Sequence, residues 1–320
     1  MDIKKIGILT SGGDAPGMNA ALRAIVRTAN KLGIEAYGIY EGFEGLITKN
    51  IKKLERFDVS SIIDRGGTFL QSARFPQFKQ EEVRKQAVEN LKEFGIDALI
   101  CIGGDGTYMG AYKLSLLGVP CIGVPATIDN DIASSEYTIG FDTTLNTIIQ
   151  CVDRLRDTTY SHHRCSVVEV MGRRCPDLAI RAGISCGAEY VIAREEDYSD
   201  EKILQVVQDA KKIGKKNCII IVCEHTIPVS HIEQVLNNDG TYETRATVLG
   251  HIQRGGTPSG FDRVLAARLG CYAVELLKEG KTGICVGIKG EELTYMDIIE
   301  ANNLPRKNPI KLMEQFKYFI

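Results

Sequence analysis

The sequence predicts an α/β fold with mainly parallel sheets, because strand-like, turn-like and helix-like segments follow one another repeatedly. Short runs rich in Ile and Val recur, and each is followed by glycines and then by a longer segment of helical periodicity. The chain has 320 residues, whereas single domains usually span roughly 100–200 residues. We therefore expect two lobes, although no repeat or polar linker marks a boundary between them.

Eight segments have the apolar, β-branched composition of buried strands. They are residues 5–10, 36–40, 98–102, 121–124, 166–170, 190–193, 218–223 and 284–288.

Three further segments predict helices. Residues 143–157 carry apolar side chains at spacings of three and four, which is typical of an amphipathic helix. A second helix is expected over residues 262–280, with Asp262 as a suitable N-cap and Gly280 as a C-terminal stop. A short helix is expected over residues 310–318.

Composition and charge exclude several classes of protein. Hydrophobic residues make up 44% and charged residues 25% of the chain, and no apolar run approaches the roughly 20 residues that cross a bilayer. A net charge of −2 gives no long-range attraction to nucleic acid. The ten cysteines form no CxxC pair, and the amino terminus lacks the long apolar core of a signal peptide. We expect a cytoplasmic protein with reduced thiols and with neither a membrane nor a nucleic-acid partner.

The first glycine turn, TSGGDAPGMNA over residues 10–20, follows the first strand and leads into a helix. Gly12, Gly13 and Gly17 permit close backbone approach to a ligand, and a helix amino terminus attracts phosphate. The segment matches neither GxGxxG nor GxxxxGK[ST], which disfavours a dinucleotide fold and a Walker-type loop. A tight turn without a ligand fits these residues equally well.

The second glycine turn, GGDGT over residues 103–107, again lies between a strand and a helical stretch. Its carboxylate, Asp105, is placed where α/β sheets gather ligands, and one carboxylate with waters and substrate phosphates suits Mg²⁺. A side chain at Gly106 would intrude on a bound nucleotide. The alternative is that Asp105 only forms the turn.

The third turn, PATIDND over residues 125–131, carries two carboxylates that can take unlike roles. We interpret Asp129 as a base that accepts the proton of an attacking hydroxyl, with Asp131 working through solvent or metal. An Asx-type turn is the structural alternative.

Cations lie beside strand ends or glycine turns elsewhere in the chain, and they could hold a phosphorylated substrate. These are Arg164, Arg173, Arg245 and Arg254, with His251 and Glu224 nearby. Guanidinium groups suit a phosphate dianion, and a carboxylate accepts hydrogen bonds from hydroxyls. Each arginine taken alone fits a solvated surface charge better.

Six motifs in order carry a resemblance to a known family. They are TSGGDAPGMNA (10–20), RGGTFLQSARFP (65–76), GGDGT (103–107), PATIDND (125–131), SVVEVMGR (166–173) and HIQRGG (251–256). Together they closely resemble the bacterial ATP-dependent 6-phosphofructokinases (the phosphofructokinase A family), from about residue 3 to about residue 300.

The resemblance implies a phosphofructokinase fold of two Rossmann-like three-layer lobes. The larger, ATP-binding lobe would comprise residues 1–138 and 252–302, and the smaller, sugar-phosphate-binding lobe residues 139–251 and 303–320. The implied reaction, a step of glycolysis, transfers the γ-phosphoryl group of MgATP to the 1-hydroxyl of D-fructose 6-phosphate. It gives fructose 1,6-bisphosphate and ADP, with Mg²⁺ as the cofactor. A homotetramer is implied as the assembly.

Matching positions imply roles for single residues. ATP binding would involve Gly12, Ala73, Arg74, Gly103, Gly104, Asp105 and Gly106, with Asp105 holding Mg²⁺. Catalysis would involve Gly12, Thr127, Asp129, Asp131 and Arg173. Sugar-phosphate binding would involve Thr127, Ile128, Asp129, Arg164, Met171, Gly172, Arg173, Glu224, Arg245, His251, Ile252, Gln253 and Arg254. Of these, Arg164 and Arg245 would reach in from a neighbouring subunit.

The family also implies an effector site between subunits, where ADP activates and phosphoenolpyruvate inhibits. The matching positions are Arg23, Arg27, Arg56, Arg156, Glu189, Lys215 and Lys216. Ile213 stands where a basic residue is usual, and Cys186 and Pro176 stand where glycines are usual. The strength and sign of effector control therefore stay open.

Two rival activities share parts of this pattern. Pyrophosphate-dependent relatives carry Asp at the place of Gly106 and Lys at the place of Ala126, and neither residue is present here. An added carboxylate would repel the α-phosphate of ATP, so Gly106 and Ala126 together favour ATP as the donor. Ala126 also departs from the glycine that is usual in the ATP-dependent family. A catalytically silent regulator is the alternative outside the enzymes. A lipid or NAD kinase would share only GGDGT.

Overall fold

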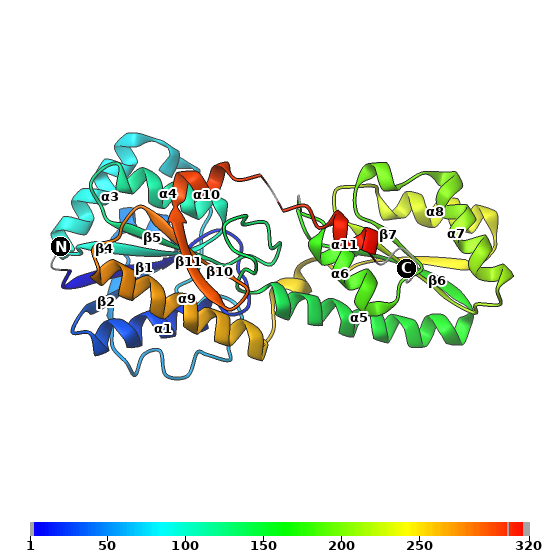
Figure 1. Cartoon of the computed structure of the whole chain (residues 1–320), viewed down its shortest axis with the longest axis horizontal. Helices are drawn as coiled ribbons and strands as arrows, with labels where there is room; N and C mark the ends of the chain where they lie inside the picture. The colour runs from blue at the N-terminus through cyan, green and yellow to red at the C-terminus, as the bar shows by residue number, and fades with distance from the viewer. Residues whose placement is uncertain (1–2, 174, 306, 316–320) are drawn as a thin grey trace. The chain divides into compact units, whose positions relative to one another are not determined.

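The computed structural model describes residues 3–173, 175–305 and 307–315. The chain divides into two compact units. Unit 1 comprises residues 1–143 and 254–306, and unit 2 comprises residues 144–253 and 307–320. Each unit is an α/β body with its own sheet (Figure 1).

Unit 1 is built on a seven-stranded sheet with the order β11-β10-β5-β4-β1-β2-β3. The strands are β1 (Lys5–Thr10), β2 (Glu35–Ile39), β3 (Ile51–Leu54), β4 (Ala98–Gly103), β5 (Cys121–Pro125), β10 (Ile284–Lys289) and β11 (Glu292–Asp297). The five inner strands run parallel, whereas β3 and β11 pair antiparallel at the two edges. Strands β4 and β5 are buried along their whole length, as expected for a parallel sheet covered on both faces.

Helices cover both faces of this sheet. They are α1 (Met18–Lys31), α2 (Phe43–Thr48), α3 (Glu81–Phe94), α4 (Asp105–Ser115), α9 (Gly260–Lys278) and α10 (Ile298–Asn303), with the 3-10 turn η1 (Pro76–Lys79). Figure 1 shows α3, α4 and α10 on one side and α1 and α9 on the other. Helices α1 and α9 pack closely together, and α4 packs on β4 and β5. This arrangement makes unit 1 a three-layer body.

Unit 2 contains a fully parallel sheet with the order β7-β8-β6-β9. Its strands are β6 (Arg164–Val170), β7 (Tyr190–Ile192), β8 (Cys218–Cys223) and β9 (Glu243–Val248). Its helices are α6 (Asp177–Cys186), α7 (Asp200–Lys212), α8 (Val229–Asp239) and α11 (Ile310–Gln315), with the 3-10 turns η2 (Glu195–Asp197) and η3 (Gly250–Arg254). Helix α5 (Phe141–His162) begins in unit 1 and continues in unit 2. The apolar sides of α7 and α8 contribute to a core with β6 and β8.

The expected α/β class and all eight expected strands are confirmed. Strands β3, β9 and β11 were not expected from the sequence. They are edge strands with exposed positions and polar residues, so they lack the apolar signature of the inner strands. Helix α11 confirms the last expected helix as far as Gln315, and residues 316–318 lie outside the described residues.

The expected start of the second helix at Asp262 is wrong. Helix α9 begins at Gly260, and its N-cap is Ser259, whose hydroxyl oxygen accepts from the Asp262 backbone N at 3.2 Å. Asp262 itself is fully buried. The short polar side chain of Ser259 fills the capping position, which leaves the carboxylate free for partners outside its own helix.

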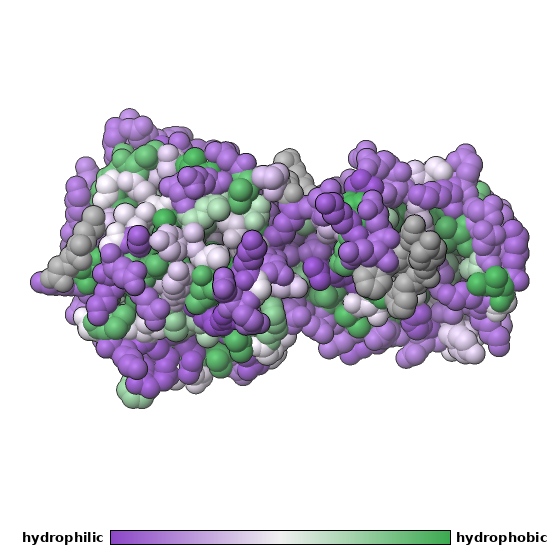
Figure 2. All heavy atoms as spheres, viewed as in Figure 1, coloured by the Kyte–Doolittle hydropathy of each residue, from purple (hydrophilic) through white to green (hydrophobic). Residues whose placement is uncertain are grey.

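Hydrophilic residues cover most of the visible face of each unit, with apolar residues scattered between them (Figure 2). Such scatter is ordinary for protein surfaces. Among the described residues, no helix combines the length and the apolar character that a membrane span requires.

A buried asparagine in α1 fixes the long segment that follows β3. Asn19 is 2% exposed, its Nδ2 donates to the Arg65 carbonyl oxygen at 3.0 Å, and its Oδ1 accepts from the Phe69 N–H at 2.6 Å. One side chain therefore satisfies both a backbone donor and a backbone acceptor of a segment without regular structure.

We expect Asn19→Ala to lower the free energy of unfolding by about 1–3 kcal/mol, because it leaves two partly buried backbone groups without their partner. Urea unfolding checks this value. Asn30→Ala in the same helix is the matched control, since the buried oxygen of Asn30 has no hydrogen-bond partner among the described residues. Equal stability losses in the two variants would contradict the assigned role of Asn19.

Candidate functional site

The first glycine turn forms a cradle at the carboxyl end of β1. Gly12 has φ 88° and Gly17 has φ 108°, both in the left-handed region that favours glycine. Gly17 is the N-cap of α1, so the chain turns directly from the cradle into the helix. The Ser11 N–H donates to the Ile102 carbonyl oxygen of β4 at 3.0 Å. The cradle is therefore anchored to the neighbouring strand.

The second glycine turn lies next to the cradle. Gly103 ends β4, and Thr107 Oγ1 donates to the Ser11 carbonyl oxygen at 3.1 Å. A Cβ at Gly103 would lie only 2.3 Å from Thr107 Oγ1 and 2.4 Å from the Ser11 oxygen. The absence of a side chain at Gly103 is thus a packing requirement. Gly106, three residues further on, is exposed, and a Cβ there would meet no described atom within 4 Å.

Two more segments border the cradle. The Ser72 hydroxyl donates to the Gly12 carbonyl oxygen at 2.7 Å, so the chain reaches the cradle directly before Ala73 and Arg74. Arg254 Nη1 donates to the Asp14 carbonyl oxygen at 3.2 Å. The structure therefore groups Arg254 with the cradle in unit 1, whereas residues 251–253 of the same motif lie in unit 2.

The third turn follows β5 and carries the expected base. Asp129 is 4% exposed, and its backbone N–H donates to Thr127 Oγ1 at 3.2 Å. Asn130 has φ 49°, and its Oδ1 accepts from the Thr138 N–H at 3.1 Å. Asp131 is 9% exposed. The bond from Thr138 to Asn130 spans eight residues, so it is not an Asx turn, and the local contact two residues apart comes from the Thr127 hydroxyl. Asp129 remains a candidate for chemistry.

The metal-ligating side chains of unit 1 are compatible with a Mg²⁺ ion that is held mainly by substrate oxygens. Asp105 is the first residue of α4 and is half-buried. Among the described residues, no group of three His, Cys, Asp or Glu side chains could enclose a metal ion. A hard ion with one protein carboxylate, waters and phosphates is the usual form of a nucleotide magnesium site.

In unit 2, a carboxylate organises the backbone after β6. Glu224 Oε1 accepts from the Gly172 N–H at 3.1 Å and from the Arg173 N–H at 2.7 Å. Arg173 has φ 54°, a conformation that costs energy for a residue with a side chain. The Met171 N–H donates to Gln253 Oε1 at 3.0 Å. Glu224 and Gln253 therefore shape the loop, in addition to any contact with a ligand.

The turn η3 carries the remaining candidates of unit 2. Gln253 is fully buried, and its Nε2 donates to the Gly250 carbonyl oxygen at 3.0 Å, whereas His251 and Ile252 are exposed. Burial, and then the nearby Glu224, raise the pKa of Glu169 on β6. Several acidic and polar groups thus gather at the carboxyl ends of β6 and β8.

Arg164 and Arg245 lie at the other end of this sheet. Arg164 begins β6, and Arg245 pairs in register with Ser166 on β9. Both guanidinium groups bind Glu243, at 2.9 Å from Arg164 Nε and 2.6 Å from Arg245 Nη2. Hydrogen bonding from Arg164 is the main cause that lowers the Glu243 pKa. A strand of this length spans roughly 20 Å, so Arg164 is distant from Arg173 within unit 2, while Arg245 lies beside the first half of β6.

The expected effector residues fall into two groups. In unit 1, desolvation and then the charges of Arg23 and Arg56 lower the pKa of Arg27, so the three arginines lie near one another. The buried Nε of Arg23 has no hydrogen-bond partner among the described residues.

In unit 2, the effector group includes an ion pair of Glu189 with Lys215. Arg156 donates to the Cys186 carbonyl oxygen, and Lys216 lies 5.8 Å from the centroid of the Tyr160 ring. Ile213, the position that departs from the family pattern, is 78% exposed.

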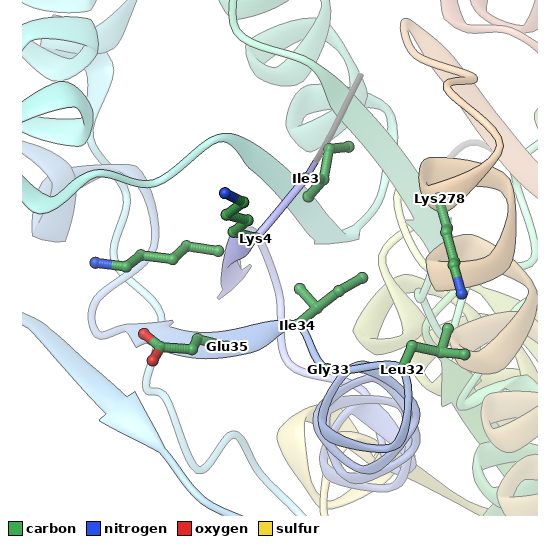
Figure 3. A pocket seen from close by; sticks show the side chains of 8 residues that line it. Ile3, Lys4, Leu32, Gly33, Ile34, Glu35 and Lys278 are labelled. Atoms are coloured by element: carbon green, nitrogen blue, oxygen red, sulfur yellow. The ribbon is translucent and has the colours of Figure 1, made fainter.

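A surface pocket of about 610 Å³ occupies another part of unit 1. It is lined by Ile3, Lys4, Lys5, Leu32, Gly33, Ile34, Glu35 and Lys278 (Figure 3). It lies at the amino ends of β1 and β2, whereas ligands of parallel α/β sheets bind at the carboxyl ends. None of the candidate site residues lines it.

Three structural supports of the site were not predicted from the sequence. Asn19, Thr138 and Asp262 are buried, and each holds the backbone of a candidate loop or of a segment beside it. A polar residue among the apolar residues of a helix can indicate such a buried support. Of the three, only Asn19 in α1 shows this pattern clearly.

The fold and the three turns at one sheet edge define a class of α/β phosphotransferases that use a nucleotide. A family model described as phosphofructokinase matches residues 5–277. An ATP-dependent 6-phosphofructokinase of Vibrio vulnificus is 58% identical over 299 residues, which are 93% of each chain. One of Aliivibrio fischeri is 56% identical over 311 residues, which are 97% of each chain. This chain belongs to the phosphofructokinase family.

A solved structure supports the same conclusion. Phosphofructokinase from Saccharomyces cerevisiae matches with a TM-score of 0.89 and 35% identity over 98% of this chain and 46% of the yeast chain. The expected family and fold are therefore confirmed.

Gly103 and Gly106 should respond differently to the same substitution. Gly103→Ala should cost about 1–3 kcal/mol of stability, because its Cβ would collide with the Ser11 carbonyl oxygen. Gly106→Ala should leave stability unchanged or raise it, since alanine is the better helix residue, but it should raise the KM for nucleotide. Urea unfolding and steady-state kinetics test the pair. A Gly106→Ala variant with normal nucleotide KM would remove that position from the nucleotide site.

Proposed function

We propose that this chain is an ATP-dependent 6-phosphofructokinase, which transfers the γ-phosphoryl group of ATP to the 1-hydroxyl of D-fructose 6-phosphate. The observation that carries the proposal is the gathering of the cradle, the GGDGT turn and the buried Asp129 at one edge of the unit 1 sheet. The high identity of relatives named ATP-dependent 6-phosphofructokinase supports the choice of donor and acceptor.

The proposed nucleotide site lies in the larger lobe, residues 1–138 and 252–302. Its residues are Gly12, Ala73, Arg74, Gly103, Gly104, Asp105 and Gly106. The backbone N–H groups at the start of α1 and α4 favour phosphate oxygens. Asp105 would hold Mg²⁺, which when bound supplies positive charge to the β- and γ-phosphates.

Asp129 is the proposed general base. Its carboxylate accepts the proton of the sugar 1-hydroxyl while the hydroxyl oxygen bonds to the γ-phosphorus. The bond from that phosphorus to the β–γ bridging oxygen breaks, and ADP leaves. Thr127 and Asp131 line the same turn, Thr127 through its hydroxyl and Asp131 through solvent or metal. This scheme needs positioning and charge neutralisation but no covalent enzyme intermediate.

The proposed sugar-phosphate site uses the smaller lobe, residues 139–251 and 303–320, together with the third turn. Its residues are Thr127, Ile128, Asp129, Met171, Gly172, Arg173, Glu224, His251, Ile252, Gln253 and Arg254. Guanidinium groups would bind the 6-phosphate, and Glu224 Oε2 would accept from sugar hydroxyls while Oε1 holds the loop backbone.

A homotetramer is proposed as the working assembly. Arg164 begins β6 whereas Arg173 follows its carboxyl end, and Arg245 pairs in register with Ser166 in the first half of β6, which supports a different phosphate contact for this pair. A neighbouring subunit would supply the pair. We further propose a cytoplasmic location and an effector site for ADP and phosphoenolpyruvate, built from Arg23, Arg27, Arg56, Arg156, Glu189, Lys215 and Lys216.

The direct test is a coupled assay for fructose 1,6-bisphosphate with purified protein, Mg²⁺ and fructose 6-phosphate. ATP and pyrophosphate are compared as donors. Product with ATP alone supports the proposal. Product with pyrophosphate would show that Gly106 and Ala126 do not select the donor, and no product with either would favour a silent regulator.

Asp129→Asn should lower kcat by about 100- to 10,000-fold, because an amide cannot accept the proton. The KM for fructose 6-phosphate should change little, since the side chain keeps its size and an oxygen acceptor. Steady-state kinetics of the variant measure both quantities. Asp209→Asn, which alters an exposed carboxylate of α7, is the control and should match the wild type. Near-normal turnover of Asp129→Asn would end its assignment as the base.

Arg245→Ala should raise the KM for fructose 6-phosphate about 10-fold or more, because a charge-assisted phosphate contact is lost. The free energy of unfolding should change little, since Arg245 pairs with Glu243 at an exposed site. Lys85→Ala, which removes an exposed cation of α3, is the control. An unchanged KM in Arg245→Ala would exclude this arginine from the site.

A further inference from the structure

A fully buried carboxylate in unit 1 has no part in the proposed chemistry. Asp262 Oδ1 accepts from the Gly140 N–H at 2.9 Å, and Oδ2 accepts from the Thr143 N–H at 2.8 Å. The Thr143 hydroxyl donates to the same Oδ2 at 2.5 Å. These donors belong to the first turn of α5 and the residue before it. Asp262 therefore caps α5 from another helix, where a negative charge suits the helix dipole.

The segment that Asp262 holds, residues 138–143, is here named the strap. Its first residues support the turn that carries Asp129. The Thr127 N–H donates to the Ile139 carbonyl oxygen at 3.1 Å, and the Thr138 hydroxyl donates to the Thr127 carbonyl oxygen at 2.7 Å. The Thr138 N–H also donates to Asn130 Oδ1 at 3.1 Å. The strap is thus bonded to the Thr127 backbone before Asp129 and to the Asn130 side chain after it.

The strap also packs against the phosphate cradle. A Cβ at Gly140 would lie 2.6 Å from the Ala15 Cβ, and a Cβ at Gly17 would lie 2.7 Å from Ile139 Cγ2. Both contacts are closer than side chains tolerate, so glycine is needed for the two segments to meet. The strap therefore contacts both the cradle and the Asp129 turn.

A second set of hydrogen bonds locks the two helix amino ends together. The Ser259 N–H donates to Thr143 Oγ1 at 2.9 Å, while the Thr143 hydroxyl donates onward to Asp262. The Ser259 hydroxyl donates to Asp142 Oδ2 at 2.5 Å. Each helix thus binds the other through its own first turn, which removes freedom from the strap between them.

We propose that Asp262 is a positioning residue of the phosphoryl-transfer reaction, which fixes the strap and thereby the distance between the base Asp129 and the phosphate cradle. The inference rests on the proposed function, because it concerns the base of that reaction. Asp262 touches no reacting atom and acts through the strap. A small displacement of a base from its productive position lowers turnover without a matching loss of binding.

Protonation of Asp262 should make the turnover of the enzyme depend on pH. Burial raises the pKa of Asp262 to about 6, although hydrogen bonds from α5 oppose the rise, and the charge of Asp142 raises it further. The neighbouring Arg263 donates from Nε to the Pro258 carbonyl oxygen, and the segment before α1 presents Gly17, which has no charge. Below this pH the protonated carboxyl group holds its three donors less well.

The test compares Asp262→Asn with the wild type from pH 5 to pH 8, with ATP, Mg²⁺ and fructose 6-phosphate. The amide cannot accept from all three donors, so kcat should fall about 10- to 100-fold, while both KM values stay within about 2-fold. Wild-type kcat should fall as the pH drops through about 6, because Asp262 becomes protonated. This fall should be absent in the variant. A purely structural role would lower the melting temperature without removing the fall.

Two further variants make the result specific. Ser199→Ala removes the N-cap of α7, so it should lower the melting temperature without changing kcat. Thr138→Val cuts the bond from the strap to Thr127, so it should lower kcat as Asp262→Asn does. The double variant of Thr138→Val and Asp262→Asn should have a kcat no lower than that of the less active single variant, because both substitutions act through the strap. Additive losses would overturn the inference.

The possible failures are distinguishable. A wild-type protein without ATP-dependent activity overturns the proposed function and this inference with it. An active wild type, with a folded Asp262→Asn variant that keeps both kcat and its fall near pH 6, overturns the inference alone. If Asp262→Asn does not fold, Thr143→Val removes one donor and should lower kcat in the same direction. Wild-type kcat in a folded Thr143→Val variant then overturns the inference.

Discussion

The parallel pairing of β4 between β1 and β5 determines where the candidate residues of unit 1 lie. Thr10 pairs with Ile102, and Gly103 pairs with Pro125, so the three strands end within one residue of each other. Neighbouring strands are about 4.8 Å apart, and the three turns therefore leave the sheet side by side. Gly103 at this edge must be a glycine because a Cβ there would lie only 2.3 Å from Thr107 Oγ1 and 2.4 Å from the Ser11 carbonyl oxygen.

Carboxylates at this protein's loops have two separate duties. Asp262 and Glu224 Oε1 hold backbone N–H groups, whereas Asp105, Asp129 and Glu224 Oε2 are candidates for contact with ligands. The division explains how a strained residue such as Arg173, with φ 54°, can be held in place before a substrate arrives. A carboxylate that accepts two N–H groups fixes a loop more firmly than neutral acceptors do. Loop geometry is therefore established by the protein alone.

The sequence predicted the inner strands and the three turns because a parallel sheet requires buried apolar runs followed by tight turns. It did not predict β3, β9 or β11, since edge strands expose half of their residues and resemble loops in composition. It also misplaced Asp262 as an N-cap. The local pattern is that of a helix start, but the partners of Asp262 lie about 120 positions earlier in the chain. Contacts of that kind leave no periodic signal.

The energetics of Asp262 favour a functional explanation for its burial. Its pKa rises from 3.8 to about 6 on folding, so the folded state binds a proton more tightly than the unfolded state does. The stability that this group contributes is present below pH 3.8 and is lost as pH rises through about 6. Through this group alone, the free energy of unfolding is therefore about 3 kcal/mol lower at neutral pH than below pH 3.8. A residue that only stabilised the fold would not need a charge there, whereas one that must hold three donors in a fixed place does.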